Sequence, residues 1–333
     1  MTNPSRRPKP ASMGRPGASR PQRPSQPTTR TPSPKSSLKS VHGASRILPS
    51  NQRNTNQLIN LVSGFSLHPS RAKETFNRPY GWRPEPRHLA AQAFEPEIFR
   101  VAAPKGLPSH VSLQADCPPV YDQGKLGSCT ANAIAAAIQV DLKRTRQKLV
   151  MPSRLYIYWN ERAQLGTIES DVGASLQLSA AVTKELGCCP ENLWPYDPKR
   201  FADVPTKKCF VEADKLRVSD AAYLDNTDVR ALKRCLAAGI PFVFGLAIYE
   251  SFERPITAAS GLIPMPKPTE AYLGGHAMMA VGYDDQTHEF LVRNSWSSHW
   301  GIDGYCWIPY DYLTNPHLAS DFWAIRALTK NRH

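Results

Sequence analysis

The feature that most constrains the fold is an alanine-rich helical pattern that begins at a single cysteine. Cys129 ends the run Gln123-Gly124-Lys125-Leu126-Gly127-Ser128-Cys129, and apolar residues recur after it at helical spacing: Ala131, Ile134, Ala135, Ile138 and Leu142. Basic residues (Lys143, Arg144 and Lys148) lie near the far end, where they suit the negative end of a helix dipole. We therefore predict a helix with Cys129 at its N-terminus.

A cysteine at this position is a candidate nucleophile. Unpaired N–H groups and the positive end of the helix dipole stabilise the thiolate, which is the attacking form of the side chain. Gly124 and Gly127 allow a tight turn close to a substrate chain. The amide of Gln123 can join the Cys129 backbone N–H in holding an oxyanion. Considered alone, Cys129 would more often be a buried structural thiol, so the assignment depends on residues downstream.

Two short apolar runs supply those residues. Residues 277–281 and 290–293 are typical of strands, and the second run leads into Asn294. A hairpin of these strands would bring Asn294 close to His276, which precedes the first strand. The amide would then hold the imidazole in the tautomer that faces the sulfur, and Trp296 would shield the bond between them from water.

These motifs resemble those of the papain-like cysteine peptidases, from about Leu107 onward. The run that ends at Cys129 matches the family's nucleophile block, and two further segments match its histidine and asparagine motifs: Gly274-Gly275-His276-Ala277, and Asn294-Ser295-Trp296 with Trp300-Gly301. The resemblance implies Cys129 as nucleophile, His276 as general base and then acid, Asn294 as orienting residue and Gln123 as oxyanion donor. The implied substrate-binding residues are Gly127, Ser128, Gly275 and Trp296.

The resemblance also carries expectations about specificity and branch. Family members select the side chain two residues before the cut, in a pocket lined near the position of Gly275, so we expect an apolar or aromatic preference over a basic one. Leu126 stands where relatives commonly have a disulfide-forming cysteine, and Ser297 stands where they have glycine. Together with Tyr121-Asp122-Gln123 and residues 191–196, the sequence is similar to the microbial and viral branch.

The rest of the chain predicts a helical half followed by a strand-rich half. Helices are expected at residues 153–164, 175–186 and 226–238, and strands at residues 242–246 and 305–308. The resemblance implies an α+β papain-like fold over residues 107–333. Its helical lobe would span about 118–213 and its β-barrel-like lobe about 214–333, with the active-site cleft between them.

The N-terminal segment has a different composition. Its first 60 residues contain 11 Lys or Arg, ten Pro and no Asp or Glu, whereas residues 101–333 contain 24 basic and 24 acidic side chains. Such a stretch cannot bury enough apolar surface to fold alone, so we predict a disordered extension over residues 1–77. Its charge suits an anionic partner, which could be nucleic acid, an acidic protein or a membrane surface. A solvated tail without a fixed partner is the alternative.

Aromatic and apolar residues return between this extension and the enzyme, at residues 80–87 and 94–99. In the family, a segment before the mature start commonly lies in the cleft and blocks it. We therefore expect residues 78–106 to be a short prosegment, or else an N-terminal strap packed on the catalytic domain.

Six cysteines besides Cys129 give no paired ligand spacing, so we expect neither a metal site nor a cofactor: Cys117, Cys188, Cys189, Cys209, Cys235 and Cys306. A disulfide from Cys188 or Cys189 to Cys209 would suit an oxidising compartment, but reduced thiols are expected in the absence of a signal peptide. Without a secretory signal or a run of about 20 apolar residues, a cytoplasmic or virion-associated monomer is favoured.

Three classes of function fit these residues. A peptidase would cleave peptide bonds through an acyl-enzyme and would use all four predicted catalytic residues. A transpeptidase, amide transferase or exopeptidase would use the same residues with another acceptor or donor. An inert peptidase fold that acts through its basic arm would not need the complete set. We therefore predict a cysteine endopeptidase that acts on peptides or proteins.

Overall fold

The computed structural model describes residues 80–85, 91, 93–96, 99, 102 and 105–329. The predicted disordered extension, residues 1–77, lies outside the described residues, as does most of residues 86–104. The chain divides into two units, Met1–Ser66 and Leu67–His333. The fold below is that of the second unit.

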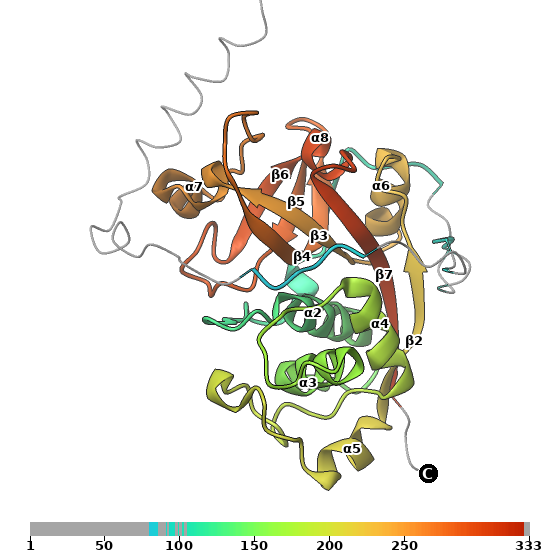
Figure 1. The fold of residues 1–333 in the computed structure, drawn as a ribbon. Helices are drawn as coiled ribbons and strands as arrows, with labels where there is room; N and C mark the ends of the chain where they lie inside the picture. Colours follow the sequence, from blue (N-terminus) through green and yellow to red (C-terminus); the bar gives the residue numbers. More distant parts are fainter. Residues whose placement is uncertain are drawn as a thin grey trace, which may run out of the picture. The chain divides into compact units, whose positions relative to one another are not determined.

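Three helices pack against one another on one side of the sheet (Figure 1): α2 (Cys129–Arg144), α3 (Arg154–Leu165) and α4 (Leu176–Glu185). Most of α2 is buried, because its alanines let neighbouring elements approach closely. The Ser153 and Ser175 side chains accept hydrogen bonds from backbone N–H groups and thereby cap α3 and α4. The short helix α5 (Lys207–Ala213) follows. Helix α2 begins at Cys129 as predicted, and α3 and α4 agree with the predicted ranges to within one residue, whereas α5 was not predicted.

Seven strands form a single antiparallel sheet: β1 (His110–Ser112), β2 (Leu216–Tyr223), β3 (Phe242–Tyr249), β4 (Tyr272–Asp284), β5 (Glu289–Arg293), β6 (Tyr305–Pro309) and β7 (Ala319–Thr329). The order is β2-β7-β3-β4-β5-β6, and β1 pairs with β4. Three short helices lie between the strands: α6 (Val229–Ala237), α7 (Pro255–Ser260) and α8 (Tyr310–Leu313). Single 3-10 turns complete the fold: Gln114–Asp116, Pro198–Arg200 and Glu250–Glu253.

Two predicted boundaries are wrong. His276 lies inside β4 rather than before it, because β3 pairs along the first part of that strand and places His276 opposite Leu246. The helix predicted from residue 226 begins instead after Asp228, whose side chain accepts a hydrogen bond from the Arg230 N–H. Asn226 is buried, and its amide donates to the backbone carbonyls of Leu313 and Ala319.

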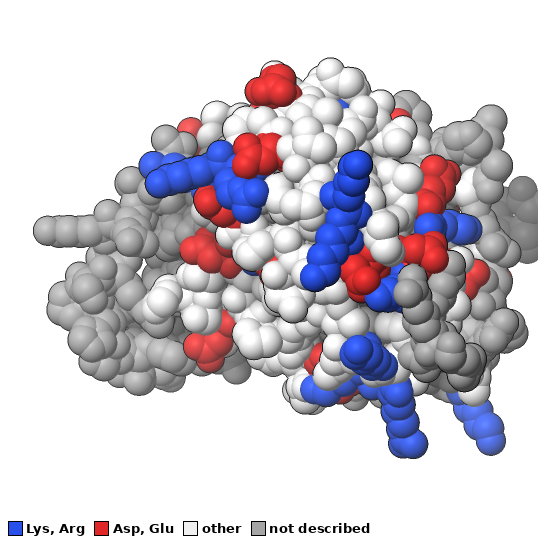
Figure 2. Space-filling view, turned by 90° about the horizontal axis from the view of Figure 1, so that it is seen from below, with Lys and Arg blue, Asp and Glu red and all other residues white. Residues whose placement is uncertain are grey.

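The surface of this unit carries both signs of charge. Figure 2 views it from below and shows Lys and Arg interspersed with Asp and Glu. This agrees with the equal numbers of basic and acidic residues over 101–333. Among the described residues, no helix combines the length and the apolar character needed to cross a membrane.

Candidate active site

Cys129 is the first residue of α2, and its side chain is completely buried. This burial raises the pKa of the Cys129 thiol to about 12, while hydrogen bonds from the backbones of Ala277, Gly81 and Thr130 oppose the rise. Ala277 follows His276 in β4, so the sulfur lies beside the peptide unit of the predicted base. Gly81 comes from the N-terminal segment that covers the site.

His276 and Asn294 are joined as the hairpin predicts. His276 Nε2 lies 2.8 Å from Asn294 Oδ1, which also accepts a hydrogen bond of 2.7 Å from the Ser295 N–H. Since Oδ1 is an acceptor, Nε2 carries the proton in the neutral imidazole and Nδ1 is the basic nitrogen. The Trp296 ring stacks on the imidazole with ring centroids 4.7 Å apart. All three side chains are buried, so the pair is shielded from water.

Gln123 connects the cysteine loop to the asparagine segment. Its side-chain Oε1 accepts a hydrogen bond of 2.6 Å from Ser295 Oγ, and its backbone N–H donates to the Ser295 carbonyl at 2.9 Å. Its Nε2 donates to the Leu126 carbonyl at 3.0 Å. The amide nitrogen has two N–H groups, so one of them remains for a further acceptor.

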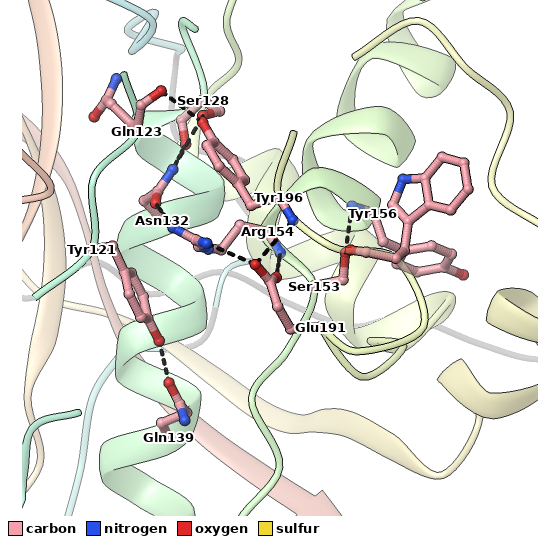
Figure 3. A network of polar contacts seen from close by, with 11 residues as sticks. Tyr121, Gln123, Ser128, Asn132, Gln139, Ser153, Arg154, Tyr156, Glu191 and Tyr196 are labelled. Atoms are coloured by element: carbon pink, nitrogen blue, oxygen red, sulfur yellow. Dashed lines mark hydrogen bonds and ion pairs between the residues drawn. The ribbon is translucent and has the colours of Figure 1, made fainter. Parts of the chain in front are cut away.

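A buried polar network supports the cysteine loop from behind (Figure 3). The Tyr196 hydroxyl lies 2.5 Å from Ser128 Oγ and donates to the Gln123 carbonyl at 2.9 Å. Asn132, one turn into α2, donates to the carbonyl and the hydroxyl of Ser128. Arg154 stacks over the Tyr196 ring and bonds Asn132 at 3.3 Å. These contacts fix the loop against α2, α3 and the segment around Tyr196.

Asp171 holds the same loop from the side. The Gly127 N–H lies 3.0 Å from both carboxylate oxygens of Asp171, which also accepts a hydrogen bond from the Tyr158 hydroxyl. That hydroxyl accepts the Gly173 N–H at 3.1 Å. Leu126, which stands where the resemblance to papain-like peptidases leads us to expect a disulfide-forming cysteine, is buried. Hydrogen bonds to a carboxylate therefore restrain a loop that lacks that disulfide.

Glu161 is a buried carboxyl group behind the first turn of α2. It accepts hydrogen bonds from Thr130 Oγ1, at 3.0 Å, and from Ser179 Oγ. Burial raises the pKa of Glu161 to about 8, and the hydrogen bonds from Ser179 and Thr130 oppose this. When ionised, Glu161 raises the pKa of Cys129 further.

Residues 80–85, here called the strap, run in an extended conformation between α2 and the sheet (Figure 1). The Trp82 N–H donates to the Gly275 carbonyl at 2.9 Å, and Gly81 and Arg83 pair with both backbone groups of Ala174. The Tyr80 ring lies edge-on to His276 with ring centroids 6.5 Å apart, and its hydroxyl donates to Glu253. The strap therefore covers the cysteine and the histidine together.

The predicted residues gather around this strap. Gln123, Gly127, Ser128 and Cys129 come from the loop and the start of α2, whereas Gly275, His276, Asn294 and Trp296 come from the sheet and the segment after β5. The sequence motifs did not identify Asp171 and Glu161, or Asp321, which accepts a hydrogen bond from the Trp82 indole. Each of these residues is distant in the sequence from the groups of the site that it contacts, so no local sequence pattern could identify it.

All seven cysteines are free thiols, so the disulfide considered from Cys188 or Cys189 to Cys209 does not form in this structure. Six of these seven thiols, Cys129 among them, are fully buried. Over the described ranges, no group of three or more His, Cys, Asp and Glu side chains is arranged as metal ligands would be.

Residues 107–322 match the papain family of cysteine proteases. The chain therefore belongs to this family. An uncharacterised peptidase C1-like protein of Acanthamoeba polyphaga mimivirus is 40% identical over 216 residues, which cover 62% of this chain and 70% of that protein. Cathepsin K of Gallus gallus is 29% identical over 198 residues, and this match spans 54% of its length.

A solved structure adds a bacterial relative. Xylellain, a cysteine protease from Xylella fastidiosa, superposes with a TM-score of 0.68 and 38% identity, covering 78% of this chain and 99% of xylellain. Together with the mimivirus protein, it confirms the predicted likeness to microbial and viral relatives. The papain-like fold is confirmed by the same comparison.

Proposed function

We propose that the chain is a cysteine endopeptidase that uses Cys129 as nucleophile, His276 as base and acid, and Asn294 as orienting residue. The observation that carries the proposal is the 2.8 Å contact between His276 Nε2 and Asn294 Oδ1, made beside a cysteine at a helix N-terminus. With Nε2 held by Asn294, the basic Nδ1 is the nitrogen that takes the thiol proton.

The reaction follows from these groups. The thiolate attacks the peptide carbonyl carbon, and the resulting oxyanion accepts hydrogen bonds from the Cys129 backbone N–H and the remaining N–H of Gln123. The protonated His276 gives its proton to the leaving amine, which breaks the C–N bond and leaves a thioester. His276 then takes a proton from water as the water attacks the thioester, and the acid product and free thiol are released.

The strap supports cleavage within a chain. Gly81 lies at the sulfur, Tyr80 lies on one side of it and residues 82–85 continue on the other. The described strap thus passes the sulfur as the interior of a chain, which supports an endopeptidase rather than an enzyme that binds a chain end. The same geometry supports a blocking role within residues 78–106, because the described part, residues 80–85, occupies the place of a substrate.

A peptide with both ends blocked tests this proposal. An acetylated and amidated peptide with an internal fluorophore and quencher should be cleaved, and mass spectrometry should find one new acid and one new amine from an internal bond. An exopeptidase would leave this peptide intact and would cut only its unblocked counterpart. A transpeptidase would instead join the acyl half to an added amine, which the same spectra would identify.

A further inference from the structure

Trp82 of the strap fills a narrow pocket beside the sulfur. Its side chain is almost completely buried between two glycines of the sheet, Gly245 on β3 and Gly275 on β4. A Cβ atom at Gly245 would lie 1.9 Å from Trp82 Cε2, and one at Gly275 would lie 2.7 Å from Trp82 Cε3. Both positions must therefore be glycine for a flat, two-ring side chain to enter.

The far end of the pocket is a carboxylate. The Trp82 indole N–H donates to Asp321 Oδ2 at 3.1 Å. Residues outside the strap provide three further donors to Asp321: the backbone N–H groups of Leu176 and Gln177 at the start of α4, and the Trp323 indole. Asp321 is 8% exposed and has a φ of 62°, a left-handed conformation that is uncommon outside glycine. Four hydrogen bonds stabilise it there.

When the strap leaves, Asp321 keeps three donors and loses the indole N–H of Trp82. Oδ2 then has an unsatisfied lone pair at the base of an apolar slot, where water is its only alternative partner. An incoming side chain that fills the slot without an N–H would displace that water and leave the carboxylate oxygen unpaired. A side chain with one N–H at its far edge would restore the fourth bond.

We propose that Asp321 makes this pocket selective for substrates with a tryptophan at the position that Trp82 occupies. The inference rests on the proposed peptidase function and names its substrate class. The backbone groups of Ala174 and Gly275 that bind Gly81, Trp82 and Arg83 are available to any extended peptide, so a substrate side chain between them enters the same slot. From Gly275 alone, the sequence predicted an apolar or aromatic preference over a basic one, and Asp321 adds a polar group to the pocket.

Tryptophan fits this pocket better than the other candidates. Phenylalanine and leucine fill part of the slot but offer no donor to Asp321. Lysine and arginine match the charge, but an ammonium has three donors and a guanidinium has five, whereas Asp321 has one acceptor position left. The indole combines a flat apolar body with a single N–H at its edge.

The test uses two end-blocked peptides that are identical except at one residue, and separate peptide pairs place that residue at the first or second position on either side of the cut. One has tryptophan there, and the other has 3-benzothienylalanine, in which sulfur replaces the indole N–H without changing the shape. Both compete for the full-length chain in one tube, and mass spectrometry follows each product. Because both peptides draw on the same free enzyme, the ratio of their kcat/KM values does not depend on how much of the strap is open.

We expect the tryptophan peptide to be preferred by about 10- to 100-fold, which is the discrimination typical of a lost hydrogen bond to a buried charged group. Asp321→Asn should reduce this ratio to within a few-fold, while the exposed control Asp311→Asn should preserve it. If Asp321→Asn does not fold, the wild-type ratio decides alone.

Equal cleavage of both peptides by the wild-type chain would overturn the role of Asp321 and leave the peptidase function intact. A preference for a lysine peptide over the tryptophan peptide would overturn the choice of side chain. If no peptide is cut by the wild-type chain or by a full-length Gly81→Ala chain, the proposed function fails and this inference fails with it. Gly81→Ala is expected to open the strap, because a Cβ atom at residue 81 would lie 1.8 Å from the Gly127 carbonyl oxygen.

Discussion

Gly81→Ala should convert a nearly inactive full-length chain into an active one. A Cβ atom at residue 81 would lie 1.8 Å from the Gly127 carbonyl oxygen and 2.7 Å from Gly127 Cα, so either the strap or the cysteine loop must move. The loop is the more firmly held of the two, because Asp171 binds its Gly127 N–H. The strap is therefore expected to leave.

The size of the effect follows from the overlap. Forcing an extra methyl group into a packed position costs about 1–3 kcal/mol. If this cost destabilises only the state in which the strap covers the site, the population with an uncovered site rises by about 5- to 150-fold. The added free energy also opposes the backbone bonds from Trp82 to Gly275 and from Arg83 to Ala174, which are lost together when the strap leaves.

The assay compares initial rates of full-length chains on one end-blocked fluorogenic peptide. Gly106→Ala is the matched control, because a Cβ atom there would meet nothing within 4 Å, and its rate should equal that of the wild-type chain. Thermal unfolding shows whether each variant remains folded. A folded Gly81→Ala chain with the wild-type rate would refute the blocking role of the strap, as would a wild-type chain that is already as active as one beginning at Leu107.

Three further changes test the site, each in the Gly81→Ala background. Gln123→Ala should lower kcat by about 10²–10³, the effect of losing one oxyanion donor, while exposed Gln164→Ala should not. Asp171→Asn should loosen the loop and lower kcat/KM by about 10- to 100-fold, because hydrogen bonds to a charged group are stronger than those to a neutral one. An unchanged kcat/KM would show that Asp171 does not support the site. Glu161→Gln should flatten the pH dependence of unfolding by urea.

The sign of the Glu161 effect follows from its raised pKa. Between its ordinary value of 4.5 and its folded value of about 8, the carboxyl is protonated in the folded state and ionised in the unfolded state. The free energy of unfolding therefore falls as pH rises through this window, and the fall is complete above about pH 8. Glu161→Gln should lose this part of the fall, whereas Glu169→Gln, at an exposed position, should keep it. Identical pH profiles for the Gly81→Ala chain with and without Glu161→Gln would contradict the assignment.

The sequence predicted the parts of the site that depend on local pattern. The helix after Cys129 has an apolar repeat, and a short hairpin brings His276 to Asn294, so both could be inferred without a fold. Asp171 and Asp321 differ, because their contacts with Gly127 and Leu176 span 44 and 145 positions along the chain. Neither residue lies in a pattern that specifies its partner.

The strap illustrates the same limit. Its aromatic residues predicted a segment that binds another surface, and the resemblance to papain-like peptidases suggested that this surface is the active-site cleft. Which side chain enters which pocket depends on register, and the register is set by the pairing of Trp82 with Gly275 and Ala174. The start of β4 was also missed, because Tyr272 and Leu273 are exposed and do not continue the apolar run by which the strand was recognised.

The central claim is that the Cys129 sulfur attacks the substrate carbonyl, and trapping the acyl-enzyme tests it most directly. The full-length Gly81→Ala chain is mixed with an end-blocked peptide ester, quenched in acid during turnover and mapped by mass spectrometry, with a Cys129→Ala chain treated in parallel. The account predicts one acyl group, attached to Cys129, and neither adduct nor turnover with Cys129→Ala. An acyl group on another residue, or peptide cleavage by the Cys129→Ala chain, would contradict it.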